Sequence, residues 1–132
     1  MTERDLPQVK AEVEAAFAAY EKALVENDVA TLGALFLDHP DTIRFGIAEN
    51  LYGYAEIQAF RAARPAAGLE RSLSRTVITT FGQNTAIAST LFHRASQPAR
   101  VGRQQQTWVR TEGGWKVAAA HVSVIQDHTE AR

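Results

Sequence analysis

A tyrosine, an arginine and a histidine each lie within a segment that is otherwise apolar, and these side chains are the first candidates for chemistry. Tyr20 shares the three- and four-residue spacing of a helical stripe, Arg44 interrupts a short apolar run, and His121 follows three alanines. A phenol donates hydrogen bonds to a carbonyl or a leaving nitrogen, a guanidinium binds carboxylates, and an imidazole transfers protons near neutral pH. Together these residue types would suit a site for a small anion.

Each of the three residues also has a structural explanation. Tyr20 is either a core aromatic whose tip reaches the surface or a pocket hydroxyl, because an unpaired buried hydroxyl costs about 1–3 kcal/mol. Arg44 must point away from its apolar neighbours, either into solvent or towards an anion. His121 alternates with Trp115 along a predicted strand, which places it inward. There it is either a hydrogen-bonded structural residue or a base.

The middle of the chain is rich in arginine. Residues 44–110 carry nine basic side chains, all of them arginine, and three acidic ones. Arginine suits bidentate recognition of carboxylate or phosphate, although most of these side chains are expected to be solvated. Arg61 and Arg64 lie three residues apart on a predicted helix and form either a carboxylate clamp or a solvated face. Arg75 lies among apolar residues of a predicted strand. We therefore keep Arg64 and Arg75 as candidate substrate-binding residues.

Other classes of site have no support in the sequence. The chain has no cysteine, its four histidines lack ligand spacing, and it has no nucleophile elbow, dinucleotide fingerprint or phosphate loop. A net charge of −1 does not favour nucleic acid. We therefore expect no metal, no cofactor and no nucleic-acid partner. The charged first residues and the absence of a long apolar run argue against a signal peptide or a membrane span, so the expected location is the cytoplasm.

These candidates must be positioned by an α+β domain. Apolar spacing predicts a long helix over residues 7–27, then a shorter helix capped by an aspartate, and a third helix over 54–65. Residues 42–47 indicate a short strand, and 49–53 a connection. Four segments rich in β-branched and aromatic residues predict an antiparallel meander over 70–82, 84–95, 99–112 and 114–126. We expect a single domain over residues 1–132, with the helices covering one face of the sheet.

The polar stretch GRQQQTWVR is expected to have a different role on each of its faces. A tight two-residue turn at Glu112-Gly113 would pair Gln104 with His121, Gln106 with Ala119 and Trp108 with Val117. The residues predicted to face a pocket are then Gln104, Gln106, Trp108, His121 and Ser123. The alternate side chains of the stretch would face outward, where a second copy of the chain could satisfy them.

The order of the elements and several short motifs resemble a known family. The order of helices and strands, ending in Trp115, is similar to the cone-shaped nuclear transport factor 2-like, or SnoaL-like, fold, a cystatin-like roll. Within that superfamily, the ordered set IRFG, FRAARP, RTVITTFG, GRQQQTW and GWKVAAAHVS resembles the AtzH-like family of small proteins found with ureide and s-triazine catabolism. The resemblance covers nearly the whole chain.

The resemblance implies three helices packed on a strongly curved, mainly antiparallel sheet, a pocket at the open end of the cone, and a homodimer through the outer sheet face. It also connects a tyrosine on the first helix and an arginine on the short strand with activity, and Tyr20 and Arg44 match these positions. The implied activity is cofactor-independent hydrolysis of an anionic, ureide-like amide, a dicarboxylated urea. Tyr20, Arg44 and His121 would be catalytic.

The fold alone does not decide the chemistry, because the same frame carries enzymes and binding proteins. One alternative is a non-catalytic binding protein or an accessory protein to an amidohydrolase. Another is isomerisation or dehydration, which an apolar pocket with an aspartate base and no arginines would favour. An N-carboxylated substrate could also be decarboxylated.

Overall fold

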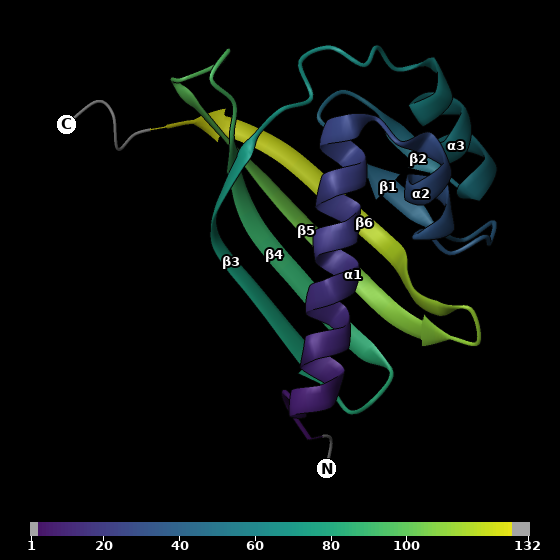
Figure 1. The fold of residues 1–132 in the computed structure, drawn as a ribbon. Coiled ribbons are helices and arrows are strands. Elements are labelled where there is room, and N and C mark those ends of the chain that lie inside the picture. The colour runs from purple at the N-terminus through teal and green to yellow at the C-terminus, as the bar shows by residue number, and fades with distance from the viewer. Residues whose placement is uncertain (1–2, 128–132) are drawn as a thin grey trace.

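The helices and strands follow the order that the sequence predicts, with one addition. The computed structural model describes residues 3–127. Its elements in chain order are α1 (Pro7–Glu26), α2 (Val29–Ala34), β1 (Ile43–Phe45), β2 (Asn50–Tyr52), α3 (Tyr54–Ala63), β3 (Ser72–Phe81), β4 (Thr85–His93), β5 (Arg100–Thr111) and β6 (Gly114–Gln126). The α+β class is confirmed (Figure 1). Among the described residues, no helix is long and apolar enough to cross a membrane.

Local sequence signals explain where the first two helices begin and end. α1 starts at Pro7, whose fixed φ and missing N–H suit the first helical turn. It ends where Asn27 takes a φ of 54°, a conformation that asparagine tolerates better than most residues. Asp28 then caps α2, as predicted, by accepting the backbone N–H of Thr31 at 3.2 Å. The short connection folds α2 back against α1.

The strands of the described chain form one mixed sheet in the order β2-β1-β6-β5-β4-β3. β3 to β6 pair antiparallel in chain order, which confirms the predicted meander. β1 pairs in parallel with β6, and β2 pairs antiparallel with β1. The sequence indicates β1 but treats β2 as a connection, because a strand of three residues is too short to show a period.

Figure 1 shows α1 lying in the curve of the sheet, with α2 and α3 at the side where β1 and β2 pair. We call the sheet face covered by α1 the inner face and the opposite one the outer face. Trp108 and Val117, both fully buried, face α1 from the sheet. The helical stripe predicted to be buried is buried, and it consists of Val9, Val13, Phe17, Tyr20 and Leu24.

A bulge decides which side chains of β6 face inward. The turn between β5 and β6 is the predicted tight hairpin, and Trp108 pairs with Val117 as expected. The next pair is Thr107 with Ala119, so one extra residue of β6 interrupts the ladder. Because successive side chains point to opposite faces, this single residue exchanges the two faces of the strand beyond it.

The predicted inward positions are confirmed for β5 and wrong for the far half of β6. Gln104 and Gln106 are 3% and 1% exposed and face α1. Gln104 pairs with Val122 instead of with His121. His121 is exposed and, like Ser123, belongs to the outer face.

Candidate functional site

A cavity of about 340 Å³ opens on the inner side of the sheet, next to the C-terminal end of α1 and the end of α3. We call it the arginine cavity. Among the described residues that line it, four are arginines and one is acidic, namely Arg44, Arg64, Arg71, Arg94 and Glu49. The lining also includes the rings of Phe60 and Phe92 and the amide of Gln104. The cavity is therefore strongly basic.

Arg44 reaches this cavity from the middle of β1. It pairs with the buried Ala120 of β6, is itself 6% exposed, and places Nη1 3.4 Å from Oε1 of Glu49. Gly46 makes room for that carboxylate, since a β carbon at this position would fall 2.1 Å from Glu49 Oε1. The IRFG motif thus combines an inward arginine with a glycine that admits its acidic partner.

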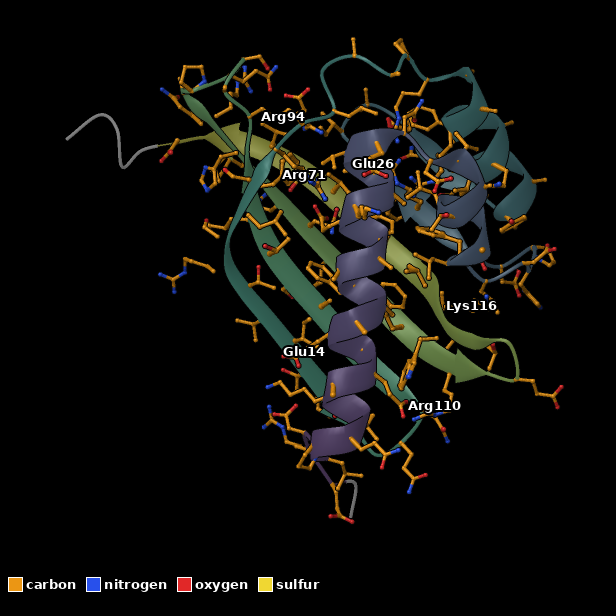
Figure 2. The ribbon with its side chains drawn as sticks, viewed as in Figure 1. Glu14, Glu26, Arg71, Arg94, Arg110 and Lys116 are labelled. Atoms are coloured by element: carbon orange, nitrogen blue, oxygen red, sulfur yellow. The ribbon has the colours of Figure 1, made fainter. Side chains whose placement is uncertain are left out.

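Arg71 and Arg94 lie just beyond the paired ends of β3 and β4 and stack on one ring. Their guanidinium carbons lie 4.5 and 5.0 Å from the centroid of Phe92. Arg71 forms an ion pair with Glu21 of α1, in which Nε is 3.1 Å from Oε2, and it also donates to Oε1 of Gln104 at 2.9 Å. Figure 2 shows both arginines beside the C-terminal end of α1.

A second ring carries the other two arginines of the cavity. The guanidinium carbons of Arg44 and Arg64 lie 5.6 and 6.0 Å from the centroid of Phe60. We call Arg44 and Arg64 the Phe60 pair, and Arg71 and Arg94 the Phe92 pair. In each pair one arginine has an acidic partner, whereas Arg64 and Arg94 form no ion pair within 4.0 Å in the described part of the chain.

The pKa values of Arg64 and Arg94 are lowered by burial and by neighbouring positive charges. Burial first, and then the charges of Arg61 and Arg44, lower the pKa of Arg64 to about 10. Burial and the charge of Arg71 likewise lower the pKa of Arg94. A bound anion would relieve both effects, because it supplies the opposite charge at short range.

Tyr20 lies behind the cavity, in contact with a further arginine. It is 1% exposed, and its Oη accepts a hydrogen bond from Nη2 of Arg61 at 3.3 Å. Burial by itself raises the pKa of this phenol, but the charges of Arg61, Arg44 and Arg71, with the hydrogen bond from Arg61, outweigh burial. The pKa of Tyr20 is therefore lower than that of an ordinary tyrosine. The tip of Tyr20 does not reach the surface, and its side chain is not part of the cavity lining. Its role as a pocket hydroxyl stays a prediction.

Many buried N–H groups around the cavity lack an acceptor. They are Nε of Arg44, Nε and Nη1 of Arg61, Nε and Nη2 of Arg64, Nε of Arg94, and Nε2 of Gln104 and Gln106. Each unpaired buried donor costs about 1–3 kcal/mol. Because this whole set consists of donors, the ligand chemistry that fits it is an anion with several oxygen acceptors, such as a carboxylate.

Three of the predicted site residues lie elsewhere. A hollow of about 530 Å³ on the outer face is lined by Arg75, His121 and Ser123 among others. Arg75 is exposed and has a φ of 51° at a bulge of β3, and the ring of His121 lies 6.0 Å from that of Phe45. The sheet separates these side chains from Tyr20 and Arg44, so the inward placement of His121 and Ser123 is wrong. Arg75 cannot share a ligand with Arg44.

Trp108 has a structural position in the core. It is fully buried, and its Nε1 donates to Oε1 of Gln106 at 3.1 Å, which fixes that amide. Among the predicted residues, Tyr20, Arg44, Arg64, Gln104 and Gln106 gather at or beside the arginine cavity. Trp108 supports them without lining it.

Sequence reasoning missed Arg71 and Arg94 as candidates and left Arg61 out of the site. A signal for the first two existed, because Arg71 and Arg94 lie at similar distances from the turn at Gly82, and an antiparallel hairpin brings such residues together. Within residues 3–127, no three side chains of the metal-binding types come together. His128 lies outside the described residues.

The comparisons with known proteins agree with this architecture. The AtzH-like family model matches residues 2–128. A crystal structure of a protein of unknown function from Pectobacterium atrosepticum is 53% identical, with 93% of this chain and 95% of that chain covered and a TM-score of 0.91. A cystatin-like fold protein from Burkholderia xenovorans is 45% identical, with coverages of 96% and 99% and a TM-score of 0.91.

A more distant structure shows the fold alone. It is a nuclear transport factor 2-like superfamily protein from Salmonella enterica, 22% identical, with 88% of this chain and 90% of that chain covered and a TM-score of 0.71. None of the curated proteins compared with the sequence matches it. The motifs, the fold and the family match lead to one assignment: the chain belongs to the AtzH-like family and has the nuclear transport factor 2-like, or cystatin-like, fold.

Proposed function

We propose that the protein is a small, cofactor-independent hydrolase of an anionic, ureide-like amide, with a dicarboxylated urea as the substrate class, in nitrogen or s-triazine catabolism. The observation that carries the proposal is the arginine cavity, where buried N–H donors lack acceptors and two arginines lack acidic partners within residues 3–127. Membership of the AtzH-like family supports the same substrate class.

The two arginine pairs suit the two ends of such a substrate. One carboxylate would bind between Arg44 and Arg64 of the Phe60 pair, and the other between Arg71 and Arg94 of the Phe92 pair. The planar guanidinium groups are pre-oriented by their rings, so less conformational entropy is lost on binding. The amide of Gln104, whose Nε2 has no acceptor, would then face the middle of the ligand.

The reaction that this arrangement supports is attack of water on the central carbonyl carbon. The water oxygen forms the new C–O bond, the C–N bond breaks, and the nitrogen keeps the electron pair and takes the proton of the Tyr20 hydroxyl. The phenolate recovers a proton from the attacking water, which regenerates Tyr20. Arginine N–H groups stabilise the charge that develops on the carbonyl oxygen. His121, on the outer face, takes no part.

Ammonia release from freshly prepared dicarboxylated urea tests the proposal. We expect turnover by the purified protein and a fall in kcat/KM of about 10²-fold or more for Tyr20→Phe and for Arg44→Ala, with unchanged circular dichroism. Arg110→Met is the control, since this arginine lies at the opposite end of the molecule (Figure 2) and should leave the rate unchanged. Accumulation of urea without ammonia, faster than in a protein-free blank, would show catalysed decarboxylation and overturn the hydrolase proposal.

A second candidate function is a binding or accessory protein for an amidohydrolase. The observation in its favour is that Glu21 and Glu49, the acidic side chains nearest the cavity in the described part of the chain, are both ion-paired with arginines. Neither is therefore free to act as a carboxylate base. Tight binding of the dicarboxylate without any turnover would select this candidate. Isomerisation or dehydration through an aspartate base gains no support, because no aspartate is among the described lining residues.

A further inference from the structure

Arg61 is a fully buried guanidinium. It lies in the last turn of α3 and forms no ion pair within 4.0 Å among residues 3–127. A buried charge without an acidic partner is destabilising, so a purely structural role would be served better by an apolar residue of similar size. Two of its nitrogens, Nε and Nη1, have no acceptor at all.

The contacts of Arg61 are aromatic and converge on Tyr20. Its guanidinium carbon lies 4.8 Å from the centroid of Phe36 and 5.7 Å from that of Tyr20, and Nη2 donates to Tyr20 Oη at 3.3 Å. The rings of Tyr20 and Phe36 are themselves 6.1 Å apart. The guanidinium is therefore held against one phenol oxygen by two rings.

This geometry fixes the direction of the Tyr20 hydroxyl. A guanidinium has donors and no acceptor, so the phenol oxygen accepts from Arg61 and cannot donate back to it. The other charged groups near Tyr20 are mostly donors as well, namely Arg44, Arg64 and Arg71, with Glu21 ion-paired to Arg71. Among these charged groups there is no free acceptor for the hydroxyl hydrogen, which is therefore available to an acceptor on a ligand.

We propose that Arg61 is the positioning residue for Tyr20: it accepts no proton itself, but it orients the hydroxyl hydrogen towards the substrate and stabilises the phenolate left after proton transfer. This inference rests on the hydrolase proposed above for the use of the proton, but its physical content is a property of the free protein. Of Arg61 and Tyr20, only Tyr20 would touch the reacting atoms.

The electrostatic consequence follows from the same contacts. Burial raises the pKa of Tyr20, and the charge of Arg61 is the largest influence that opposes burial, ahead of Arg44 and Arg71. Removal of Arg61 should therefore move the ionisation of Tyr20 to higher pH. Tyr52 and Tyr54 are the other tyrosines of the chain, so the signal of Tyr20 must be separated from theirs.

The first test is a spectroscopic pH titration of the phenolate absorbance without substrate. The contribution of Tyr20 is obtained by subtracting the curve of the Tyr20→Phe variant from that of the parent. We expect this contribution to appear at lower pH in the wild type than in Arg61→Met, with the Arg110→Met control unchanged. A Tyr20 titration that is the same with and without Arg61 would overturn the inference, whatever the activity of the protein.

The second test uses kinetics on the dicarboxylated urea. Arg61→Met should lower kcat by about 10- to 100-fold with little change in KM, and adding it to Tyr20→Phe should cause no further loss. A large rise in KM instead would mean that Arg61 holds a substrate carboxylate, and would contradict a positioning role. Should Arg61→Met fail to fold, Arg61→Lys keeps the charge, and its Tyr20 titration should lie near that of the wild type. If Arg61→Met shifts the Tyr20 titration but the protein shows no turnover, the hydrolase proposal fails and the effect of Arg61 on Tyr20 stands.

Discussion

Phe92 of β4 pairs directly with Gly102 of β5, and its ring occupies the space that a side chain at Gly102 would need. A β carbon there would fall 2.0 Å from Phe92 Cζ. The same ring carries Arg71 and Arg94. The arrangement of the Phe92 pair therefore requires a glycine at position 102, the first residue of the GRQQQTW motif.

Gly102→Ala should displace Phe92 and disorganise this arginine pair. We expect a loss of stability of about 1–3 kcal/mol from overpacking, together with weaker binding of glutarate, a stable dicarboxylate. Thermal unfolding and isothermal titration calorimetry measure the two effects. Gly113→Ala is the matched control, because its β carbon would meet ordinary contacts of 3.6 Å or more. Unchanged glutarate binding in Gly102→Ala would show that the Phe92 pair does not bind the ligand.

Glu49→Gln should change stability and affinity in opposite directions. The substitution removes the one acidic side chain among the described lining residues, which faces Arg44 at 3.4 Å. Without ligand the buried guanidinium loses its counter-charge, so the melting temperature should fall; with glutarate present, the anion replaces the lost carboxylate and the affinity should rise. Melting curves with and without glutarate provide the comparison. A fall in both quantities would mean that Glu49 helps to bind the ligand.

Substitution of Arg64 or Arg94 should weaken the binding of a dicarboxylate more than the binding of a monocarboxylate. Arg64→Met and Arg94→Met should each weaken glutarate binding by about 10- to 100-fold, the equivalent of one lost charge-assisted hydrogen-bonded contact. Butyrate can use whichever pair remains, so its affinity should change little in either variant. Titration calorimetry with both acids checks this. Equal losses for glutarate and butyrate would show that one carboxylate subsite exists instead of two.

We further propose that the outer face pairs with a second copy of the chain. Ile87 and Val77 are 36% and 59% exposed on the strands β4 and β3, next to the hollow lined by Arg103, Gln105 and His121. Sedimentation velocity should give twice the chain mass of 14.5 kDa, and Ile87→Lys should give the monomer mass. A monomeric wild-type protein at micromolar concentration would contradict this proposal.

The sequence predicted most elements because their signals are local. The 3–4 spacing around Tyr20, the aspartate cap at Asp28 and the two-residue turn before Gly114 each depend on a few neighbouring residues. From the sequence alone, Arg44 points either into solvent or towards an anion. Its pairing with the buried Ala120 shows that it faces inward. These features needed no knowledge of distant contacts.

The rest depended on register and on side-chain reach. One extra residue in the run Val117-Ala118-Ala119-Ala120 moves His121 to the outer face, and three identical small side chains give no pattern that reveals it. Arg71 and Arg94 lie just beyond the ends of their strands, where alternation no longer assigns a face. Their role follows from the ring of Phe92, a contact between elements that sequence spacing does not encode.

A crystal structure with bound acetonedicarboxylate, the isostere of a dicarboxylated urea with CH₂ in place of NH, would locate both carboxylate subsites at once. We predict one carboxylate within hydrogen-bonding distance of Arg44 and Arg64 and the other at Arg71 and Arg94. The CH₂ that replaces the leaving nitrogen should face the Tyr20 hydroxyl, and the ketone oxygen should face arginine N–H groups. A ligand found in the outer hollow beside His121, with the arginine cavity free of it, would show that the arginine cavity is not the substrate site.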